Sequence, residues 1–400
     1  MEGTAQREAP ARVAPPAEDL SFAVRFSDGS TLHEGRGEPK FTVRIGDRAR
    51  WRKLLATNAY TVAQGYVAGE FDLEGDFVEA VRFYERQPRP ALLDWLLRAA
   101  GQLDPVLRIA RSRSGAARDV RFHYDRSNEF YRLFLDQQMV YSCAYFREPG
   151  YSLEEAQVAK LDLICRKLDM RAGGRFLDIG CGWGALLLHA AERFGVCATG
   201  CTLSARQFDY AGDAASRSPA HERLALYETD YRNLNGRFDK IASVGMFEHV
   251  GRPRLPGYFS KVCNLLADGG LFLNHGLIRP ASVEESAETL FMRRFVFPGT
   301  ELVTLGEAVT MAEHAGFEVL DVENLRPHYA LTCRAWLDRL GANAEACKAL
   351  VGERTYRTWR LAFAGFALCF EEGWMDLCQI LMAKRRHPRA RRMSREYMYG

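Results

Sequence analysis

Three glycines and a carboxylate form the segment of this sequence whose chemistry is easiest to interpret. Gly180-Cys-Gly-Trp-Gly184 follows a short apolar run at residues 175–179, and a helical pattern at residues 185–194 comes next. Glycines let the backbone turn sharply and approach a ligand closely, beneath the positively polarised start of a helix. Asp178 stands two residues before the first glycine. This spacing is typical of S-adenosylmethionine sites, where the carboxylate and the loop hold the amino-acid end of the cofactor.

Two further roles are open to the same glycine loop. Dinucleotide-binding sites use similar loops, and a turn can need glycines for packing alone. A dehydrogenase should carry an acid at the end of its second strand, and the run that ends at Thr199 has none. The sequence therefore favours S-adenosylmethionine over a dinucleotide.

Polar side chains recur at the ends of the strands that follow. Strand patterns alternate with helical patterns, and the strands are expected at residues 175–179, 196–199, 223–227, 238–244 and 270–275. This alternation predicts a doubly wound, Rossmann-like α/β sheet whose ligands bind beyond the carboxyl ends of its strands. The residues at those ends should share one pocket: Asp178, the glycines, Thr202, Asp230, Glu248 and His275. Ser204 is expected to cap the next helix.

Length and composition indicate a globular protein of two domains. The chain has 400 residues, of which 47% are hydrophobic and 26% are charged. No apolar run approaches the roughly 18 residues of a membrane span, and the N-terminus lacks a signal-peptide core. We therefore expect a cytosolic protein whose membrane contact is peripheral. The ten cysteines are scattered without a C-x-x-C pair, which predicts reduced core thiols and no metal site.

The chain divides into segments of different character. We expect a disordered tail at 1–20, a smaller N-terminal α+β domain at 21–105, a basic linker at 106–122 and a catalytic domain at 123–400. The linker contains Arg108, Arg111, Arg113, Arg118 and Arg121, and a second basic cluster lies at residues 384–395. Such runs are solvated faces, or they bind nucleic acid or anionic lipid. Neither is interleaved with the aromatic residues of single-strand binders, so nucleic acid is not expected.

Five segments, taken in order, resemble one enzyme family. They are His123-Tyr-Asp-Arg-Ser-Asn-Glu-Phe-Tyr131, Met139-Val-Tyr-Ser-Cys-Ala-Tyr-Phe146, residues 177–184, Thr202-Leu-Ser-Ala-Arg-Gln207 and residues 238–251. From about His123 to Lys384 the chain is similar to the cyclopropane fatty acid synthases and the related mycolic acid cyclopropane synthases. Residues 41–76 look like the N-terminal domain of the bacterial phospholipid-acting members, which the mycolate-acting members generally lack. The resemblance therefore favours the phospholipid branch.

This resemblance implies a reaction. S-adenosylmethionine would methylate the cis double bond of an unsaturated acyl chain in an anionic membrane surface, which leaves a carbocation. Loss of a proton from the new methyl group would then close a cyclopropane ring. Tyr124, Tyr141 and Phe247 are candidate aromatic faces for the cation, although core packing is the simpler role for Phe247. The sequence does not give the oligomeric state, and a homodimer stays a candidate assembly.

The resemblance also implies site residues. The base in the family is a bound bicarbonate ion, and its ligands match Cys143, Glu248, His275 and Tyr329, with the backbone near Leu277 assisting. The expected cofactor contacts lie around the glycine loop and on the segments that face it: Tyr124, Tyr141, Ser142, Asp178, Gly180, Gly182, Gly184, Thr202, Ser204, Gln207, Asp230 and Tyr231.

One position departs from the family pattern, and several activities stay open. Many relatives have a cysteine four residues before the aromatic that matches Phe370, where this chain has Phe366; Cys369 is out of register. The alternatives are an enzyme that makes methyl-branched or methylenated chains, a small-molecule N-methyltransferase, and a catalytically silent binding protein. The bicarbonate ligand set favours ring closure, because N-methylation needs no base for a methyl proton.

Overall fold

Two compact units make up the computed structural model, and they are described separately. The structure describes residues 20–57, 59–86, 127–283, 302–385 and 392–399. The units divide between Leu93 and Asp94. Residues 1–19 of the expected tail and the whole expected linker lie outside the described residues.

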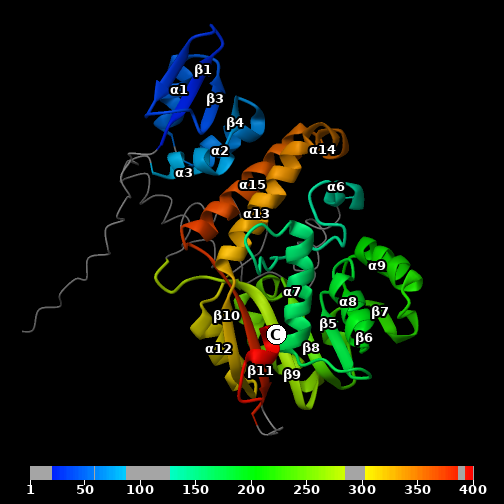
Figure 1. The fold of residues 1–400 in the computed structure, drawn as a ribbon. Helices are drawn as coiled ribbons and strands as arrows, with labels where there is room; N and C mark the ends of the chain where they lie inside the picture. Colours follow the sequence, from blue (N-terminus) through cyan, green and yellow to red (C-terminus); the bar gives the residue numbers. More distant parts are fainter. Residues whose placement is uncertain (1–19, 58, 87–126, 284–301, 386–391, 400) are drawn as a thin grey trace, which may run out of the picture. The chain divides into compact units, whose positions relative to one another are not determined.

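The described residues of the N-terminal unit form a four-stranded sheet with three helices (Figure 1). The sheet has the order β2-β1-β3-β4, in which β1 and β3 are parallel and the other two pairings are antiparallel. Its elements are β1 (Phe22–Phe26), β2 (Thr31–Glu34), β3 (Phe41–Ile45), α1 (Arg48–Leu55), α2 (Ala59–Ala68), β4 (Phe71–Gly75) and α3 (Phe77–Glu85). Buried rings hold the helices on the sheet, because Phe22 contacts Phe41, Trp51 and Phe83 at centroid distances of 5.2, 6.2 and 4.5 Å.

The second unit contains a seven-stranded sheet of order β10-β11-β9-β8-β5-β6-β7. The strands are β5 (Arg175–Ile179), β6 (Cys197–Thr202), β7 (Leu224–Glu228), β8 (Phe238–Val244), β9 (Leu266–Ile278), β10 (Phe317–Asn324) and β11 (Asp376–Lys384). The five expected strands, β5 to β9, pair in parallel, and β11 is antiparallel to both β9 and β10. The chain order reverses at β5, between β6 and β8, which is where such sheets bind ligands.

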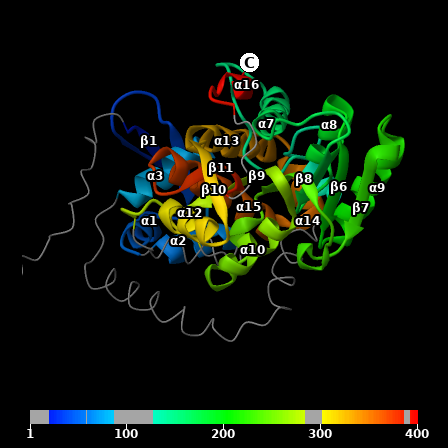
Figure 2. The ribbon, with the colours of Figure 1, turned by 90° about the horizontal axis from the view of Figure 1, so that it is seen from below.

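Helices cover both faces of this sheet. They are α6 (Asn128–Arg132), α7 (Leu153–Lys167), α8 (Ala185–Phe194), α9 (Ala205–Arg217), α10 (Leu255–Leu265), α12 (Leu305–His314), α13 (Arg326–Ala342), α14 (Ala344–Val351), α15 (Glu353–Glu371) and α16 (Glu396–Tyr399). Figure 2 shows α7 and α8 on one side of the sheet and α10 on the other. Phe176 packs in the α7 and α8 core, whereas its neighbour Leu177 packs in the α10 and α12 core. The prediction of a doubly wound α/β fold with a smaller N-terminal α+β part is confirmed.

The basic cluster near the C-terminus is partly neutralised within the catalytic unit. Arg385 pairs with Glu313, Arg392 with Asp169 and Arg395 with Asp321. Each of these three arginines is therefore held in an ion pair with an acidic residue of the second unit. In the part of the chain that the structure describes, no helix is both long and apolar enough to cross a membrane.

Candidate active site

The glycine loop has the backbone conformation that its sequence predicts. Gly180, Gly182 and Gly184 have φ values of 78°, 54° and 91°, a region that L side chains rarely adopt. The amides of Gly180 and Cys181 both donate to the carbonyl of Cys201, at 3.0 Å, which ties the loop to the end of β6. A methyl group built on Gly182 would meet no atom within 4 Å, so this glycine faces open space.

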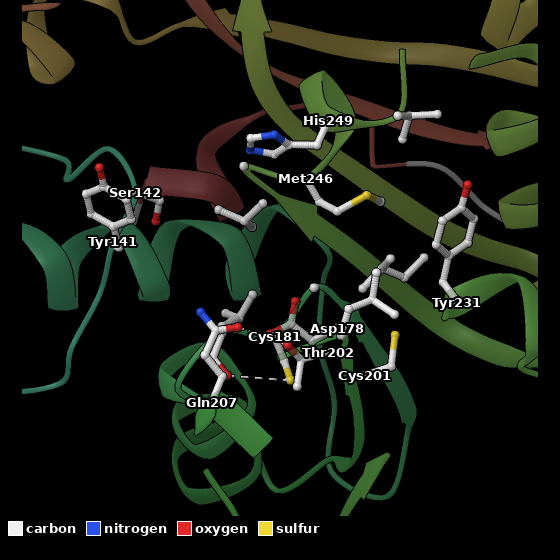
Figure 3. Close-up of a pocket in the computed structure, with 18 of the residues that line it drawn as sticks. Tyr141, Ser142, Asp178, Cys181, Cys201, Thr202, Gln207, Tyr231, Met246 and His249 are labelled. Atoms are coloured by element: carbon white, nitrogen blue, oxygen red, sulfur yellow. Dashed lines mark hydrogen bonds between the residues drawn. The ribbon is translucent and has the colours of Figure 1, made fainter. Parts of the chain in front are cut away.

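That open space is a cavity of about 530 Å³ at the carboxyl ends of the central strands (Figure 3). Pockets for small ligands typically measure about 300–1,000 Å³. Most of the predicted cofactor contacts line it: Tyr141, Ser142, Asp178, Gly180, Gly182, Thr202, Gln207, Asp230 and Tyr231. Figure 3 shows Tyr141 and Ser142 across the cavity from Thr202 and Gln207. The structure therefore brings together side chains from segments that are far apart in the sequence.

Two predicted cofactor residues, Gly184 and Ser204, are not among the described residues that line the cavity. Gly184 begins α8, and a Cβ there would lie 3.1 Å from the Cβ of Ala211, so its lack of a side chain permits close packing. Ser204 caps α9 by accepting from the amide of Gln207 at 3.4 Å, as expected. The Thr202 hydroxyl donates to Gln207 Oε1 at 2.9 Å, and this hydrogen bond fixes the orientation of both side chains. Tyr124 lies outside the described residues.

The acid at the end of β7 is held by its neighbour. Asp230 accepts from the backbone amide of Arg232 at 2.9 Å and from the Arg232 guanidinium Nε at 2.8 Å. Both side chains line the cavity. Asp230 therefore lines the cavity as the acidic partner of Arg232 in an ion pair.

A buried cation and a buried acid lie on the inner wall of the cavity. Burial raises the pKa of Asp178 to about 7, against the attraction of the Lys160 ammonium. Burial lowers the pKa of Lys160 to about 8, and its Nζ donates to Ser142 Oγ at 3.1 Å. Sequence reasoning missed Lys160. The available signal was its position on α7 between the apolar Ala156 and Ile164, one helical turn away on each side.

Glu248 and His275 are both buried, and neither is among the described residues that line the cavity. The amide of Gly245, which lines the cavity, donates to the carbonyl of His275 at 2.9 Å. A Cβ on Gly276, next to His275, would lie 3.2 Å from Glu248 Oε2. Burial raises the pKa of Glu248 to about 7, and hydrogen bonding at the backbone of Leu277 acts in the opposite direction. Among the described residues, neither Glu248 Oε2 nor His275 Nε2 has a hydrogen-bond partner.

Cys143 and Tyr329, the other two predicted bicarbonate ligands, are both connected to the carbonyl of Leu325. Burial raises the pKa of the Cys143 thiol far above its usual value, so the thiol stays protonated. Its Sγ lies 3.1 Å from the carbonyl oxygen of Ala144 and 3.9 Å from that of Leu325, and the amide of Tyr329 donates to the Leu325 carbonyl. The amide of Leu325 donates to the carbonyl of Leu377 on β11, and Leu377 pairs with Leu277 on β9. These contacts link the segments that carry Cys143, Tyr329 and His275.

Aromatic rings lie between the cavity and Tyr329. Tyr141 contacts Trp336 at a centroid distance of 5.0 Å, and Trp336 contacts Tyr329 at 6.0 Å. Tyr329 also stacks on Phe370 at 4.6 Å. Phe247, in contrast, belongs to the hydrophobic core under α10, where it packs near Tyr258.

The residues fit both groups that the site was expected to hold. The open space before Gly182 accommodates a ligand that approaches the backbone, as the amino-acid end of S-adenosylmethionine would. The carboxylate of Glu248 can accept a hydrogen bond and the imidazole of His275 can donate one, which suits an oxyanion that carries one proton, such as bicarbonate. The described residues contain no group of three His, Cys, Asp or Glu side chains placed to hold a metal ion.

Comparison with known proteins places the chain in a family. A family model described as mycolic acid cyclopropane synthetase matches residues 111–380. A "Probable fatty acid methyltransferase" of Pseudomonas putida is 38% identical over 382 residues, 94% of this chain and 95% of the relative. The cyclopropane synthase MmaA2 from Mycobacterium tuberculosis matches in structure with a TM-score of 0.65 and 32% identity, over 67% of this chain and 98% of its own.

A second solved structure gives the same result. The mycolic acid cyclopropane synthase CmaA1, complexed with SAH and CTAB, matches with a TM-score of 0.63 and 34% identity, over 67% of this chain and 98% of its own. The family model covers well over half of the chain, and the Pseudomonas relative covers nearly all of it. The protein therefore belongs to the mycolic acid cyclopropane synthetase family of S-adenosylmethionine-dependent methyltransferases.

Proposed function

We propose that this protein converts cis double bonds of unsaturated phospholipid acyl chains into cyclopropane rings. The observation that carries the proposal is that Glu248 Oε2 and His275 Nε2 are both buried without a partner among the described residues, on segments whose neighbours line the cofactor cavity. An unpaired acceptor and an unpaired ring nitrogen in a dry site suit a bound bicarbonate. Ring closure needs such a base.

Bound S-adenosylmethionine supplies the methyl group. The glycine loop and Asp178 would hold its amino-acid end, with the Thr202–Gln207 pair on the same side and Tyr141 and Ser142 across the cavity (Figure 3). These residues would orient the cofactor toward the alkene. An alkene is a poor nucleophile, so alignment and exclusion of water account for much of the acceleration.

Attack of the alkene forms one carbon–carbon bond, breaks the sulfur–methyl bond and leaves a positive charge on the neighbouring carbon. The aromatic row Tyr141–Trp336–Tyr329 provides π faces for that charge, each contributing roughly 1–2 kcal/mol when desolvated. A bicarbonate held at Glu248 and His275 would supply the base for the proton of the new methyl group. The remaining carbon–hydrogen electron pair then closes the ring. The carboxylate of Glu248 orients the ion, and the protonated thiol of Cys143 adds no negative charge.

Two features support phospholipid as the substrate class. The Pseudomonas relative matches the N-terminal unit as well as the catalytic unit, whereas the mycobacterial structures match only 67% of the chain. Within the N-terminal unit, α1 carries four exposed basic residues, Arg48, Arg50, Arg52 and Lys53. We propose that this unit docks on anionic lipid, so that the acyl chain enters the site without crossing water.

A second candidate is methylation or methylenation to give a branched chain. It is favoured by the name of the Pseudomonas relative, a probable fatty acid methyltransferase. Both routes share the cofactor and the carbocation, and they differ in what happens to that cation. A saturated branch takes up a hydride from outside the substrate, whereas the ring only loses a proton.

Expression in a bacterial host that lacks its own synthase tests the proposal. Cells fed S-adenosylmethionine precursors with a deuterated methyl group should form phospholipids that gain one CD₂ per double bond, and parallel unlabelled cells provide the proton spectra, in which the upfield resonances of a cyclopropane should appear. Retention of all three deuterons with loss of unsaturation would support the saturated branch. Olefinic resonances of a methylene group would support methylenation, and unchanged lipids would overturn all three activities.

A further inference from the structure

Gln379 lies next to His275 on the neighbouring strand, outside the set of residues assigned so far. The two residues form a cross-strand pair of β9 and β11. Each side chain is 1% exposed, and Gln379 Nε2 lies 3.1 Å from His275 Nδ1. This is the hydrogen bond that the structure gives to the imidazole of His275.

The direction of this hydrogen bond decides the tautomer of the histidine. Burial, together with the Lys160 and Lys167 cations, lowers the pKa of His275 well below its usual value, so the ring is neutral. A neutral imidazole has one N–H donor and one acceptor nitrogen. The amide Nε2 of glutamine can only donate, so His275 Nδ1 must accept and the ring proton must lie on Nε2.

The proton is then on the nitrogen that has no partner among the described residues. A buried N–H without a partner costs free energy, and an oxyanion is its natural acceptor. The other tautomer would present a lone pair at Nε2 and repel the same anion. A carboxylate at position 379 would favour that tautomer or the imidazolium, because it accepts from Nδ1–H. Glutamine does neither in the amide orientation of the structure, in which Nε2 faces the ring and Oε1 has no partner among the described residues.

We propose that Gln379 is a positioning residue that holds His275 as the Nε2–H tautomer, so that the otherwise unpartnered Nε2 of His275 donates to a bound oxyanion. The identity of the anion as bicarbonate rests on the proposed function, but the tautomer does not. Gln379 contacts the imidazole on the side away from the anion, and it therefore acts only through His275.

Nuclear magnetic resonance of the full-length protein with ¹⁵N-labelled histidine tests the tautomer directly. The His275 resonances are assigned by their loss in His275→Asn. The wild type should show a protonated Nε2 and an unprotonated Nδ1. Gln379→Glu should move the proton to Nδ1 or protonate both nitrogens, and Gln379→Met should remove the single preference. A wild type that carries its proton on Nδ1 would overturn the proposal.

Kinetics then separate positioning from folding. In Gln379→Met, the bicarbonate concentration for half-maximal turnover should rise roughly tenfold or more, as for loss of a hydrogen bond to a charged group. S-adenosylmethionine affinity should stay within about twofold in the same variant. Gln379→Asn, which keeps the amide but shortens the side chain, should rescue part of the loss. Equal losses in cofactor affinity and turnover would indicate a merely structural role and overturn the positioning claim. A wild type that shows the expected tautomer but no dependence of turnover on bicarbonate would overturn bicarbonate as the proposed base. The assignment of Gln379 would remain.

Discussion

Asp178 and Glu248 are two buried carboxyl groups whose positions give them different tasks. Burial raises the pKa of each to about 7. Asp178 lines the cofactor cavity near the Lys160 ammonium, whereas Glu248 is not among the described residues that line it and has one oxygen unpaired among the described residues. The first is expected to affect binding of the cofactor, and the second is expected to affect the step after methyl transfer.

Turnover should rise as the pH rises through about 7, because Glu248 must be ionised to accept from the anion. Glu248→Gln should lose this dependence and lower turnover by roughly 10²–10⁴-fold, with little change in S-adenosylmethionine affinity. Asp178→Asn is the matched control, since it should weaken cofactor binding instead. Steady-state rates and calorimetric titrations from pH 6 to 9 measure both. Wild-type turnover in Glu248→Gln would contradict the role of this carboxylate.

The same substitution should stabilise the fold at high pH. The pKa of Glu248 rises from 4.5 to about 7 on folding, so the stability from its protonated form is present below the lower value and is lost as the pH rises through the higher one. Glu248→Gln removes the buried charge. Its melting temperature should exceed that of the wild type at pH 8, and the difference should disappear near pH 4. A difference that does not depend on pH would contradict burial as the cause.

Gly182 should be needed for the cofactor more than for the fold. Alanine at its φ of 54° costs about 1–2 kcal/mol of stability. The new methyl would also point into the cavity, where the cofactor binds. Gly173→Ala is the matched control: its φ is 76°, it meets no atom within 4 Å, and it lies away from the cavity. Both variants should melt earlier, but only Gly182→Ala should lose S-adenosylmethionine affinity by calorimetry. Equal affinities would remove the loop from the cofactor site.

At the scale of elements, the contact between β9 and the short helix at residues 247–249 sets the position of Glu248. A Cβ on Gly276 of β9 would lie 2.7 Å from the Phe247 ring and 3.2 Å from Glu248 Oε2. Gly276→Ala should therefore displace this helix, lower stability by about 1–3 kcal/mol and reduce turnover more than cofactor affinity. Gly306→Ala in α12, where the added methyl meets nothing within 4 Å, should leave turnover unchanged. Thermal melts and kinetics check both, and full activity in Gly276→Ala would exclude tight packing there.

The elements that repeat a local pattern could be predicted from the sequence. The helix Ala185–Phe194 and the strand Arg175–Ile179 begin and end as predicted, because glycines bound each of them. The helical pattern that begins at Arg48 forms two helices, α1 and α2, which are separated near Ala56. The strands β10 and β11 were not predicted, because antiparallel pairing at a sheet edge depends on contacts distant in the sequence.

The candidate site was predictable to the same extent. Residues at strand ends and in the glycine loop could be found by position alone, and most of them line the cavity. Lys160 and Gln379 were missed because each lies within an apolar element whose pattern indicates core. Their importance follows from partners on other elements, Ser142 and His275, which no local pattern reveals.

At the scale of the whole molecule, the proposed substrate is buried in a bilayer while the site is buried in the protein. Moving an acyl chain into water costs about 0.8 kcal/mol per CH₂, so the protein must dock before it binds the chain. We propose that the N-terminal unit provides part of this docking surface through the basic face of α1. The expected linker arginines, which lie outside the described residues, would add to it.

Vesicle sedimentation tests the docking surface. Arg52→Gln combined with Lys53→Gln should weaken binding to anionic vesicles by roughly 2 kcal/mol at low salt, at about 1 kcal/mol per charge. The matched control, Arg171→Gln with Arg175→Gln, removes the same charge at the amino end of β5, opposite the cavity. It should leave vesicle binding unchanged. Neutralising Arg108, Arg111 and Arg113 should reduce vesicle binding further at moderate ionic strength. Equal binding by all variants would leave the catalytic unit as the membrane contact.

The antiparallel insertion of β11 has a consequence for how the chain is made. β9 carries His275, and its neighbour on one side is β11, which is synthesised about a hundred residues later. Until Lys384 has left the ribosome, β9 is an apolar strand with an open edge, which is the kind of surface that chaperones cover and that aggregates when it is left bare. A transcript truncated before Asp376 would encode the whole glycine loop and no Gln379. Its product would contain the cofactor loop but lack Gln379 beside His275. Chaperones and proteases would recognise the exposed edge of β9.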